Sequence, residues 1–207
     1  MPFQLFIFDF DGTLADSGPW MFAALNRAAE RYGLRQVAEA EIERLRGRDS
    51  RAIIRELGVP LWRLPQIAAY VRQLAKDGES PPLFPGIASV LRQLHAADRK
   101  LAVVSSNTEE TIRRALGPDC AGLFHAYACN ASMFGKASKF KRVLKMTGTP
   151  PDRAIAIGDE TRDLEAARAA RIANAAVAWG YATPALLKAQ KPDYFFETPQ
   201  DIAALAQ

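Results

Sequence analysis

Two aspartates, one residue apart, follow the first apolar stretch of the chain. Residues 3–8 are mostly large, aromatic or branched, and the stretch is too short for a helix, which is typical of a strand buried on both faces of a parallel sheet. Side chains alternate along a strand, so we expect Asp9 and Asp11 to point to the same side. Two carboxylates at the carboxyl end of a central strand cost free energy unless they have a function. Open α/β sheets bind their ligands at the carboxyl ends of their strands.

Polar side chains also follow two later apolar stretches, at residues 100–104 and 154–157. These side chains, and a lysine that begins a predicted helix, are Ser105, Ser106, Asn107, Asp159, Asp163 and Lys136. Each of them alone has an ordinary explanation as a turn, a cap or a solvated charge. Gathered at one sheet edge, they suit a phosphate bound with a divalent cation, which would offset the repulsion between the carboxylates. Hard oxygen ligands favour Mg²⁺.

The elements that must position these residues alternate between strand and helix. The apolar stretches predict strands at residues 3–8, 100–105, 124–129, 154–159, 172–178 and 193–196. Helical patterns predict helices at residues 87–97, 108–116, 136–146, 161–170 and 199–206. This alternation predicts an α/β fold with a parallel, doubly wound sheet.

A helical insert interrupts this alternation between residues 17 and 76, where charged residues and alanines are interleaved with Leu and Ile. Asp16 or Ser17 is placed to cap its first helix, and Gly33 fits the end of that helix. Three prolines between residues 80 and 86 predict a stiff connection back. We therefore expect an α/β core domain at residues 1–15 and 83–207, and a helical domain at 16–82.

Composition limits the classes of function. The 207 residues are 49% hydrophobic and 24% charged, with a net charge of +4, which is ordinary for a globular protein. The basic residues are spread among acids, so we expect no nucleic-acid partner. The two cysteines have no CxxC spacing, which argues against zinc. We see no signal peptide and no membrane span, and expect a cytoplasmic protein.

Four motifs in order resemble those of the haloacid dehalogenase-like hydrolases. Residues 9–14, Asp-Phe-Asp-Gly-Thr-Leu, resemble the first motif, and the strand ending at Ser105 resembles the second. Lys136 is similar to the lone lysine of the third motif, and residues 158–163 to the fourth, Gly-Asp-x-x-x-Asp. The helical insert and residues 177–181 resemble the phosphoglycolate phosphatase-like branch. The resemblance implies a Rossmannoid core with a parallel sheet and an inserted helical cap domain.

Two positions depart from the pattern of that branch. It often has Lys-Pro at the third motif, whereas Lys136 is followed by Ala-Ser-Lys. Lys139 is therefore a rival, although we favour Lys136 because the helix is expected to begin there. Arg171 stands where a glycine commonly ends the helix after the fourth motif, which concerns local geometry rather than chemistry.

The resemblance implies a mechanism through an aspartyl-phosphate. Asp9 would attack phosphorus, Asp11 would act as general acid and then general base, and Lys136 would neutralise charge. The resemblance assigns substrate binding to Gly12, Thr13, Ser105, Ser106 and Asn107, and Arg48 is a candidate contact from the helical insert. It assigns Mg²⁺ binding to Asp9, the backbone carbonyl of Asp11, Asp159 and Asp163.

The function we expect is Mg²⁺-dependent hydrolysis of a small phosphorylated metabolite, of the phosphoglycolate or sugar-phosphate type, by a monomer or homodimer. Two alternatives remain. A phosphomutase of the same superfamily would share the chemistry of Asp9 but return the phosphate to a sugar. A receiver-like signalling module also gathers acids and a lysine around Mg²⁺, but its phosphorylated aspartate follows a later strand.

Overall fold

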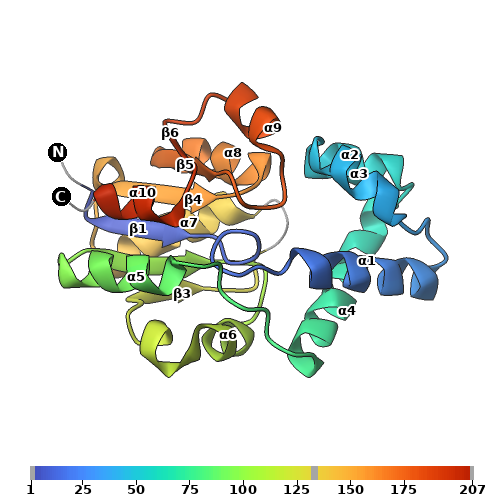
Figure 1. The fold of residues 1–207 in the computed structure, drawn as a ribbon, viewed down its shortest axis with the longest axis horizontal. Helices are drawn as coiled ribbons and strands as arrows, with labels where there is room; N and C mark the ends of the chain where they lie inside the picture. The colour runs from blue at the N-terminus through green and yellow to red at the C-terminus, as the bar shows by residue number, and fades with distance from the viewer. Residues whose placement is uncertain (1–2, 132–134, 206–207) are drawn as a thin grey trace.

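A six-stranded parallel sheet forms the centre of the molecule (Figure 1). The computed structural model describes residues 3–131 and 135–205. In the order β3-β2-β1-β4-β5-β6, the strands are β3 (Ala126–Ala128), β2 (Lys100–Val104), β1 (Leu5–Phe8), β4 (Ala154–Gly158), β5 (Ala173–Val177) and β6 (Tyr194–Phe196). The parallel, doubly wound sheet predicted from the sequence is confirmed.

Helices cover both faces of this sheet. On one face, Phe6 and Phe8 pack in a core with α5 (Ile87–Ala96), α6 (Glu109–Ala121) and α10 (Pro199–Ala204). On the other face, Leu5 and Ile7 pack with α7 (Lys136–Thr147) and α8 (Thr161–Ala170). Alternate residues of β1 thus enter opposite cores, which explains why this strand is apolar throughout.

The register of the central strands aligns their carboxyl ends. Phe8, the last residue of β1, lies opposite Val103 of β2 and Ile157 of β4. The residues that follow these three strands therefore emerge side by side at one edge. We call this end of the sheet, where the carboxyl ends of β1, β2 and β4 lie, the sheet edge. The candidate functional site lies there.

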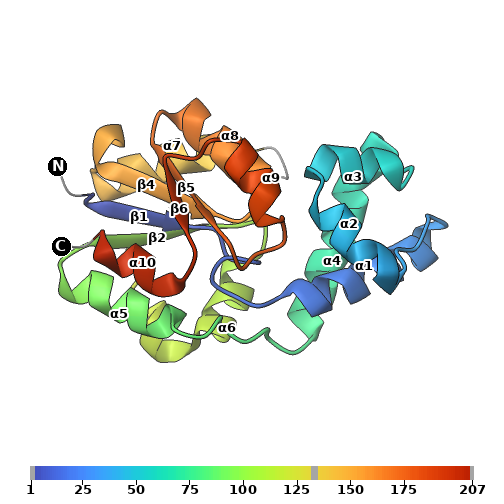
Figure 2. The same ribbon diagram turned by 45° about the horizontal axis from the view of Figure 1, so that its top comes forward.

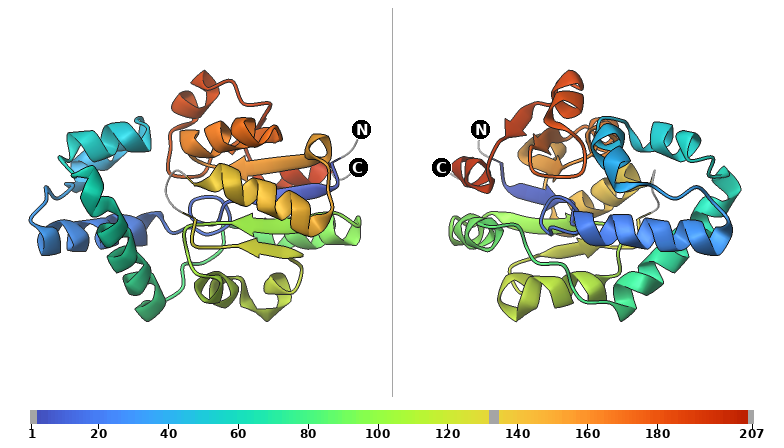
Figure 3. Two further views of the ribbon diagram at one scale, coloured as in Figure 1. Left: turned by 180° about the vertical axis from the view of Figure 1, so that it is seen from behind. Right: turned by 45° about the vertical axis from the view of Figure 1, so that its right-hand side comes forward.

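Four further helices lie together beyond this edge, beside the sheet rather than on its faces (Figures 2 and 3). This helical group consists of α1 (Gly18–Tyr32), α2 (Ile42–Arg46), α3 (Ser50–Glu56) and α4 (Leu64–Asp77). Two connections join it to the sheet, and they pair through hydrogen bonds from Asp16 N to Pro82 O (2.8 Å) and from Phe84 N to Leu14 O (3.0 Å). That the helical group is a separate domain stays a prediction.

The structure differs from the sequence-based expectation in a few places. Helix α9 (Pro184–Ala189), between β5 and β6, was not predicted. Helix α6 extends past a kink at Gly117, whose φ is +69°. The predicted end of the last helix, Ala206, lies outside the described residues. Short 3₁₀ turns precede α2, α4 and β4, at η1 (Glu39–Glu41), η2 (Leu61–Arg63) and η3 (Pro151–Arg153).

Within the described ranges, each helix is too short or too polar to cross a lipid bilayer.

Candidate functional site

Three neighbouring strands are followed by polar side chains at the same end of the sheet. Asp9 follows β1, Ser105 follows β2, and Asp159 follows β4. Ser105 and Asp159 are fully buried, and Asp9 is only 7% exposed. The backbone N–H of Asn107 donates to Ser105 Oγ at 3.1 Å, so the serine hydroxyl keeps its own proton for another acceptor.

Lys136, the first residue of α7, reaches the same end of the sheet. Its ammonium donates to the carboxylates of Asp9 and Asp163 and is 96% buried. The rival Lys139 instead donates to the backbone oxygen of Cys129 at 3.1 Å. Of the two lysines, the geometry therefore brings Lys136 and not Lys139 to the strand ends.

Asp9, Lys136, Asp159 and Asp163 make up what we call the strand-end cluster. Each of its three acids offers a carboxylate oxygen within 4.8 Å of those of the other two. Three such oxygens are the hard ligands that a divalent cation prefers. The cluster is therefore suited to holding a metal ion.

Burial without a counter-ion disfavours charge on most of these carboxyls. Burial raises the pKa of Asp9 to about 7, against the lowering effect of Lys136, and also raises the pKa of Asp159 well above its ordinary value. For Asp163, burial is outweighed by Lys136 and Arg162, so its pKa is lowered. One lysine thus does not compensate three buried acids, and a divalent cation would supply the missing positive charge.

Asp159 packs directly against two glycines. We call these glycines, together with Thr13 and Tyr181, the seat of Asp159. A Cβ atom on Gly12 would lie 2.2 Å from Asp159 Oδ2, and one on Gly180 would lie 2.1 Å from Asp159 Cβ. The Thr13 hydroxyl donates to Asp159 Oδ1 and the Tyr181 N–H donates to Oδ2, both at 2.8 Å. The seat fixes both carboxylate oxygens of Asp159.

Gly12 and Thr13, which we expected to bind substrate, both have partners within the chain. The Gly12 N–H donates to the carbonyl of Ala15 at 2.9 Å, and the Thr13 hydroxyl donates to Asp159. Both residues thus help to position Asp159, and their contact with a substrate stays a prediction.

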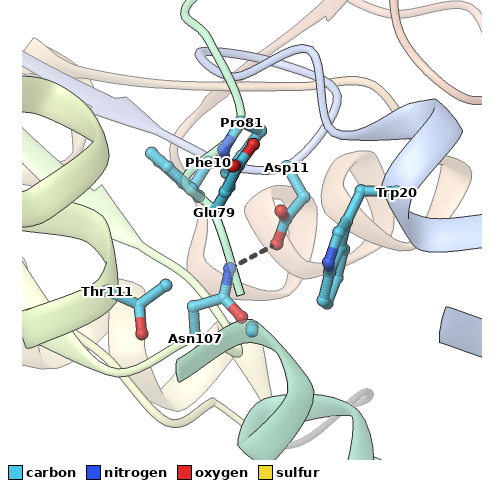
Figure 4. Close-up of a pocket in the computed structure, with 8 residues that line it drawn as sticks. Phe10, Asp11, Trp20, Glu79, Pro81, Asn107 and Thr111 are labelled. Atoms are coloured by element: carbon cyan, nitrogen blue, oxygen red, sulfur yellow. Dashed lines mark hydrogen bonds between the residues drawn. The ribbon is translucent and has the colours of Figure 1, made fainter. Parts of the chain in front are cut away.

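Asp11 lies next to the strand-end cluster with its carboxylate held from two sides. Ser17 Oγ donates to Asp11 Oδ1 at 2.9 Å, and Asn107 Nδ2 donates to Oδ2 at 2.8 Å. Burial raises the pKa of Asp11, although the Ser17 hydrogen bond opposes the shift. Asn107, expected to bind substrate, donates one of its two side-chain N–H groups to Asp11 (Figure 4), and its contact with a substrate stays a prediction.

A small cavity opens beside Asp11, between the sheet edge and the helical group (Figure 4). Its volume of about 10 Å³ is room for about one water molecule. The residues that line it come from both parts of the molecule and are Phe10, Asp11, Trp20, Ala75, Glu79, Pro81, Asn107 and Thr111. The space next to Asp11 therefore suits a small group.

The helical group contacts the sheet edge through α2 and α3. Arg46 donates to the carbonyls of Tyr181 (2.9 Å) and Gly180 (3.1 Å), and its own carbonyl accepts from Thr183 N at 3.0 Å. The Ser50 hydroxyl donates to the carboxylate of Glu160. These contacts hold the helical group against the segment that seats Asp159.

Two other predicted site residues are placed less directly. Arg48 pairs with Glu56 of α3 at 3.0 Å and is half exposed, so it lies within the helical group, and its contact with a substrate stays a prediction. Ser106 is partly buried beside Ser105, and its role likewise stays a prediction.

Sequence reasoning missed four residues at this edge: Ser17, Arg46, Arg162 and Tyr181. Arg162 pairs through two hydrogen bonds with Glu160, from Nε at 3.0 Å and Nη2 at 2.6 Å. Burial opposes its charge, but Glu160 and Asp163 raise the pKa of Arg162. The charged residues between Asp159 and Asp163 were a visible hint, whereas nothing local in the sequence marks Arg46.

Comparison with known proteins places this geometry in a family. The family described as "Haloacid dehalogenase-like hydrolase" matches residues 6–177. A protein from Synechococcus elongatus named phosphoglycolate phosphatase is 35% identical over 201 residues, covering 96% of this chain and 95% of that protein. A protein from Mycobacterium tuberculosis named tyrosine-protein kinase PtkA is 30% identical, covering 86% of this chain and 63% of that protein.

Solved structures show the same fold. A haloacid dehalogenase-like family hydrolase from Streptococcus pneumoniae superposes with a TM-score of 0.81 at 23% identity, covering 99% of both chains. At that identity the likeness concerns the fold alone. It covers the sheet and the helical group together.

Proposed function

The chain belongs to the haloacid dehalogenase-like hydrolases and is an enzyme of the phosphatase type, and we propose that it hydrolyses a small phosphorylated metabolite through a phosphorylated Asp9. Phosphoglycolate is the first candidate substrate, because relatives from Synechococcus elongatus and Aquifex aeolicus carry the name phosphoglycolate phosphatase. Sugar phosphates are the second candidates.

The observation that carries the proposal is the strand-end cluster itself. Asp9 is a buried carboxylate held by the ammonium of Lys136 and by the N–H of Phe10 at 2.7 Å. A nucleophile must be fixed in this way to attack phosphorus in line. Lys136 and the Ser105 hydroxyl would hold the phosphoryl oxygens as charge develops on them.

The acids of the strand-end cluster fit Mg²⁺, which Asp9 and Asp159 would hold together with the backbone carbonyl of Asp11. Asp163, whose carboxylate accepts from Lys136 as that of Asp9 does, would either be a further ligand or orient the other two acids. When bound, the ion would neutralise the charge of the phosphoryl group and of the carboxylates. The donor set, three carboxylate oxygens within 4.8 Å of one another, supports this proposal.

Asp11 is the proposed general acid and base. Its raised pKa favours the protonated form that gives a proton to the leaving oxygen, and its ionised form would then take a proton from water. The cavity beside it has room for one water. This supports water as the acceptor and a small leaving group.

The experiment is a phosphate-release assay with Mg²⁺ on a panel of phosphorylated metabolites that includes phosphoglycolate. Asp9→Asn keeps the size of the side chain but removes the nucleophile, so turnover should fall by a factor on the order of 10⁴. Asp152→Asn, the same change at an exposed position, should leave turnover unchanged. Unaltered activity in Asp9→Asn would refute the proposal.

Three other fates of the phosphoryl group would be distinguished by their products. A phosphomutase would give an isomerised sugar phosphate instead of free phosphate. A phosphate that stays on the protein for minutes would indicate a signalling module. Transfer to a protein tyrosine, which the name of the Mycobacterium relative would suggest, would appear as labelled protein substrate.

A further inference from the structure

The side chains of Asp11, Ser17 and Tyr181 are linked in series by hydrogen bonds. Ser17 Oγ lies 2.9 Å from Asp11 Oδ1, and the Tyr181 hydroxyl lies 2.6 Å from Ser17 Oγ. Tyr181 is 164 residues from Ser17 in sequence and belongs to the segment after β5. The proposed roles of Asp9 and Asp11 do not account for this tyrosine.

Ser17 gives up an ordinary structural role to take part in this series. It occupies the N-cap position of α1, where a serine hydroxyl normally accepts from an N–H of the first helical turn. In this protein it makes no such capping hydrogen bond, although that bond is typically worth about 1 kcal/mol. The hydroxyl is fully buried and is directed at Asp11 instead.

The direction of the hydrogen bonds follows from the number of protons. A serine hydroxyl has one proton to donate, and Ser17 gives it to Asp11. The Tyr181 hydroxyl must therefore donate to Ser17.

The backbone of Tyr181 is fixed from both sides. Its N–H donates to Asp159 Oδ2 at 2.8 Å, and its carbonyl accepts from Arg46 Nε at 2.9 Å. The first bond ties it to the strand-end cluster, and the second ties it to the helical group. The backbone of Tyr181 is thus held in place, so its side chain starts from a fixed position beside Ser17 and Asp11.

We propose that Tyr181 is a positioning residue, whose hydroxyl orients Ser17 so that Ser17 holds Asp11 in place to protonate the leaving oxygen of the substrate. This rests on the proposed function, since it assumes the acid role of Asp11. It adds to that role a residue that is 164 positions from Ser17 in sequence. It also explains why the Ser17 hydroxyl does not cap its helix.

The test uses two substrates that differ in their need for an acid. The alkoxide leaving from phosphoglycolate must be protonated, whereas p-nitrophenolate leaves without help. In Tyr181→Phe, kcat/KM should fall about tenfold for phosphoglycolate, or for the best alkyl phosphate of the panel, the effect of about one lost hydrogen bond. For p-nitrophenyl phosphate it should fall by less than about threefold.

Two variants control for a merely structural effect. Tyr127→Phe removes another tyrosine hydroxyl, which donates to Ala121 O at 2.8 Å in the core, and should leave both substrates unaffected. Ser17→Ala should reproduce the preference of Tyr181→Phe for the aryl phosphate. Adding Tyr181→Phe to Ser17→Ala should change nothing further, because the tyrosine acts through the serine.

The outcomes separate the inference from the function on which it rests. Equal losses on both substrates in Tyr181→Phe, no loss, or a full additional loss in the double variant would overturn the role of Tyr181 while Asp9-dependent hydrolysis stands. A wild-type protein that hydrolyses none of the substrates would overturn the proposed function and this inference with it.

Discussion

The sheet edge and the helical group are built in opposite ways. At the sheet edge, charged side chains are buried, and glycines, backbone amides and neighbouring strands fix them. In the helical group, charged residues form exposed ion pairs, such as that of Arg44 with Glu41 and Glu56, and α3 has no buried residue. Exposed pairs contribute little to stability, whereas buried ones are strongly destabilising when one partner is removed.

This difference indicates a division of work. The sheet edge fixes the groups that do the chemistry, and changes there are expected to be severe. The helical group is held to the α/β part by a few hydrogen bonds, among them those of Arg46 with Tyr181 and Gly180 and those of Arg114 with the end of α4. It lines the cavity beside Asp11 with Trp20. A loosely packed group of this kind can vary in sequence without disturbing the reaction, so we expect substrate choice to lie there.

Apart from the loss of the nucleophile itself in Asp9→Asn, the largest effect should come from Lys136→Met. The substitution removes the ammonium that pairs with the buried carboxylates of Asp9 and Asp163. We therefore expect the free energy of unfolding to fall by about 3 kcal/mol and kcat to fall on the order of a thousandfold. Urea unfolding and phosphate release measure the two.

Two controls decide whether this effect belongs to the sheet edge. Lys139→Met removes the bond to the Cys129 carbonyl, and Arg44→Met removes two exposed ion pairs of the helical group, those of Arg44 with Glu41 and Glu56. Both should change kcat by less than about threefold and stability by less than about 1 kcal/mol. A larger loss in Lys139→Met than in Lys136→Met would contradict the assignment of the lysine.

The pH dependence of stability should differ between the two regions. Asp9 has a pKa of about 7 in the folded protein against an ordinary value of 3.8, so the folded state binds the proton more tightly than the unfolded state. Without metal, its effect is therefore a loss of stability as the pH rises from about 4 through 7. In the helical group the pKa values of Glu41 and Glu56 are lowered, chiefly by hydrogen bonds from Ala38 N–H and Arg44, which acts in the opposite direction.

Mg²⁺ should offset the loss of stability that the ionised carboxyls of the sheet edge cause at higher pH. At pH 8 we expect Mg²⁺ to raise Tm, because it binds the ionised carboxyls, and at pH 5 we expect little change. Thermal unfolding with a chelator and with Mg²⁺ at both pH values is the measurement. An equal rise in Tm at pH 5 and pH 8 would show that the ion acts elsewhere.

The smallest effect should come from Arg171→Gly, away from the sheet edge. Arg171 ends α8 with a φ of +60°, a left-handed conformation that glycine adopts without strain. The substitution should stabilise the protein by up to about 1 kcal/mol and leave kcat unchanged. Gly148→Ala, at the matching left-handed end of α7, should destabilise it by a similar amount, and a stable Gly148→Ala would contradict this explanation.

The positions that the sequence predicted are those fixed by local patterns. Apolar stretches with turn residues after them located β1, β2 and β4, and parallel strands bring their ends together. The departure noticed at Arg171 corresponds to a real left-handed residue. Even α9 had a local pattern, Thr183 before Pro184, in which the threonine side chain caps the helix, and we overlooked it.

The remaining parts of the site depend on contacts between distant segments. Arg46 meets Tyr181 across 135 residues, and Thr13 turns to Asp159 across 146. A short motif gives residue types and spacing, but the fold decides whether a hydroxyl faces the substrate or another side chain. For that reason the sequence placed Gly12, Thr13 and Asn107 near the site but gave no sign of their partners within the chain.

The proposed reaction depends on the transfer of the phosphoryl group to the carboxylate of Asp9, which gives an acyl phosphate. The direct measurement is to mix the protein with Mg²⁺ and phosphoglycolate, or the best substrate of the panel, to quench with acid within milliseconds, and to locate the phosphate by mass spectrometry of the peptides. We predict a phosphate on Asp9 that decays as free phosphate is released and that is missing in Asp9→Asn. Continued turnover with no phosphate on Asp9, or with the phosphate on another residue, would contradict the account.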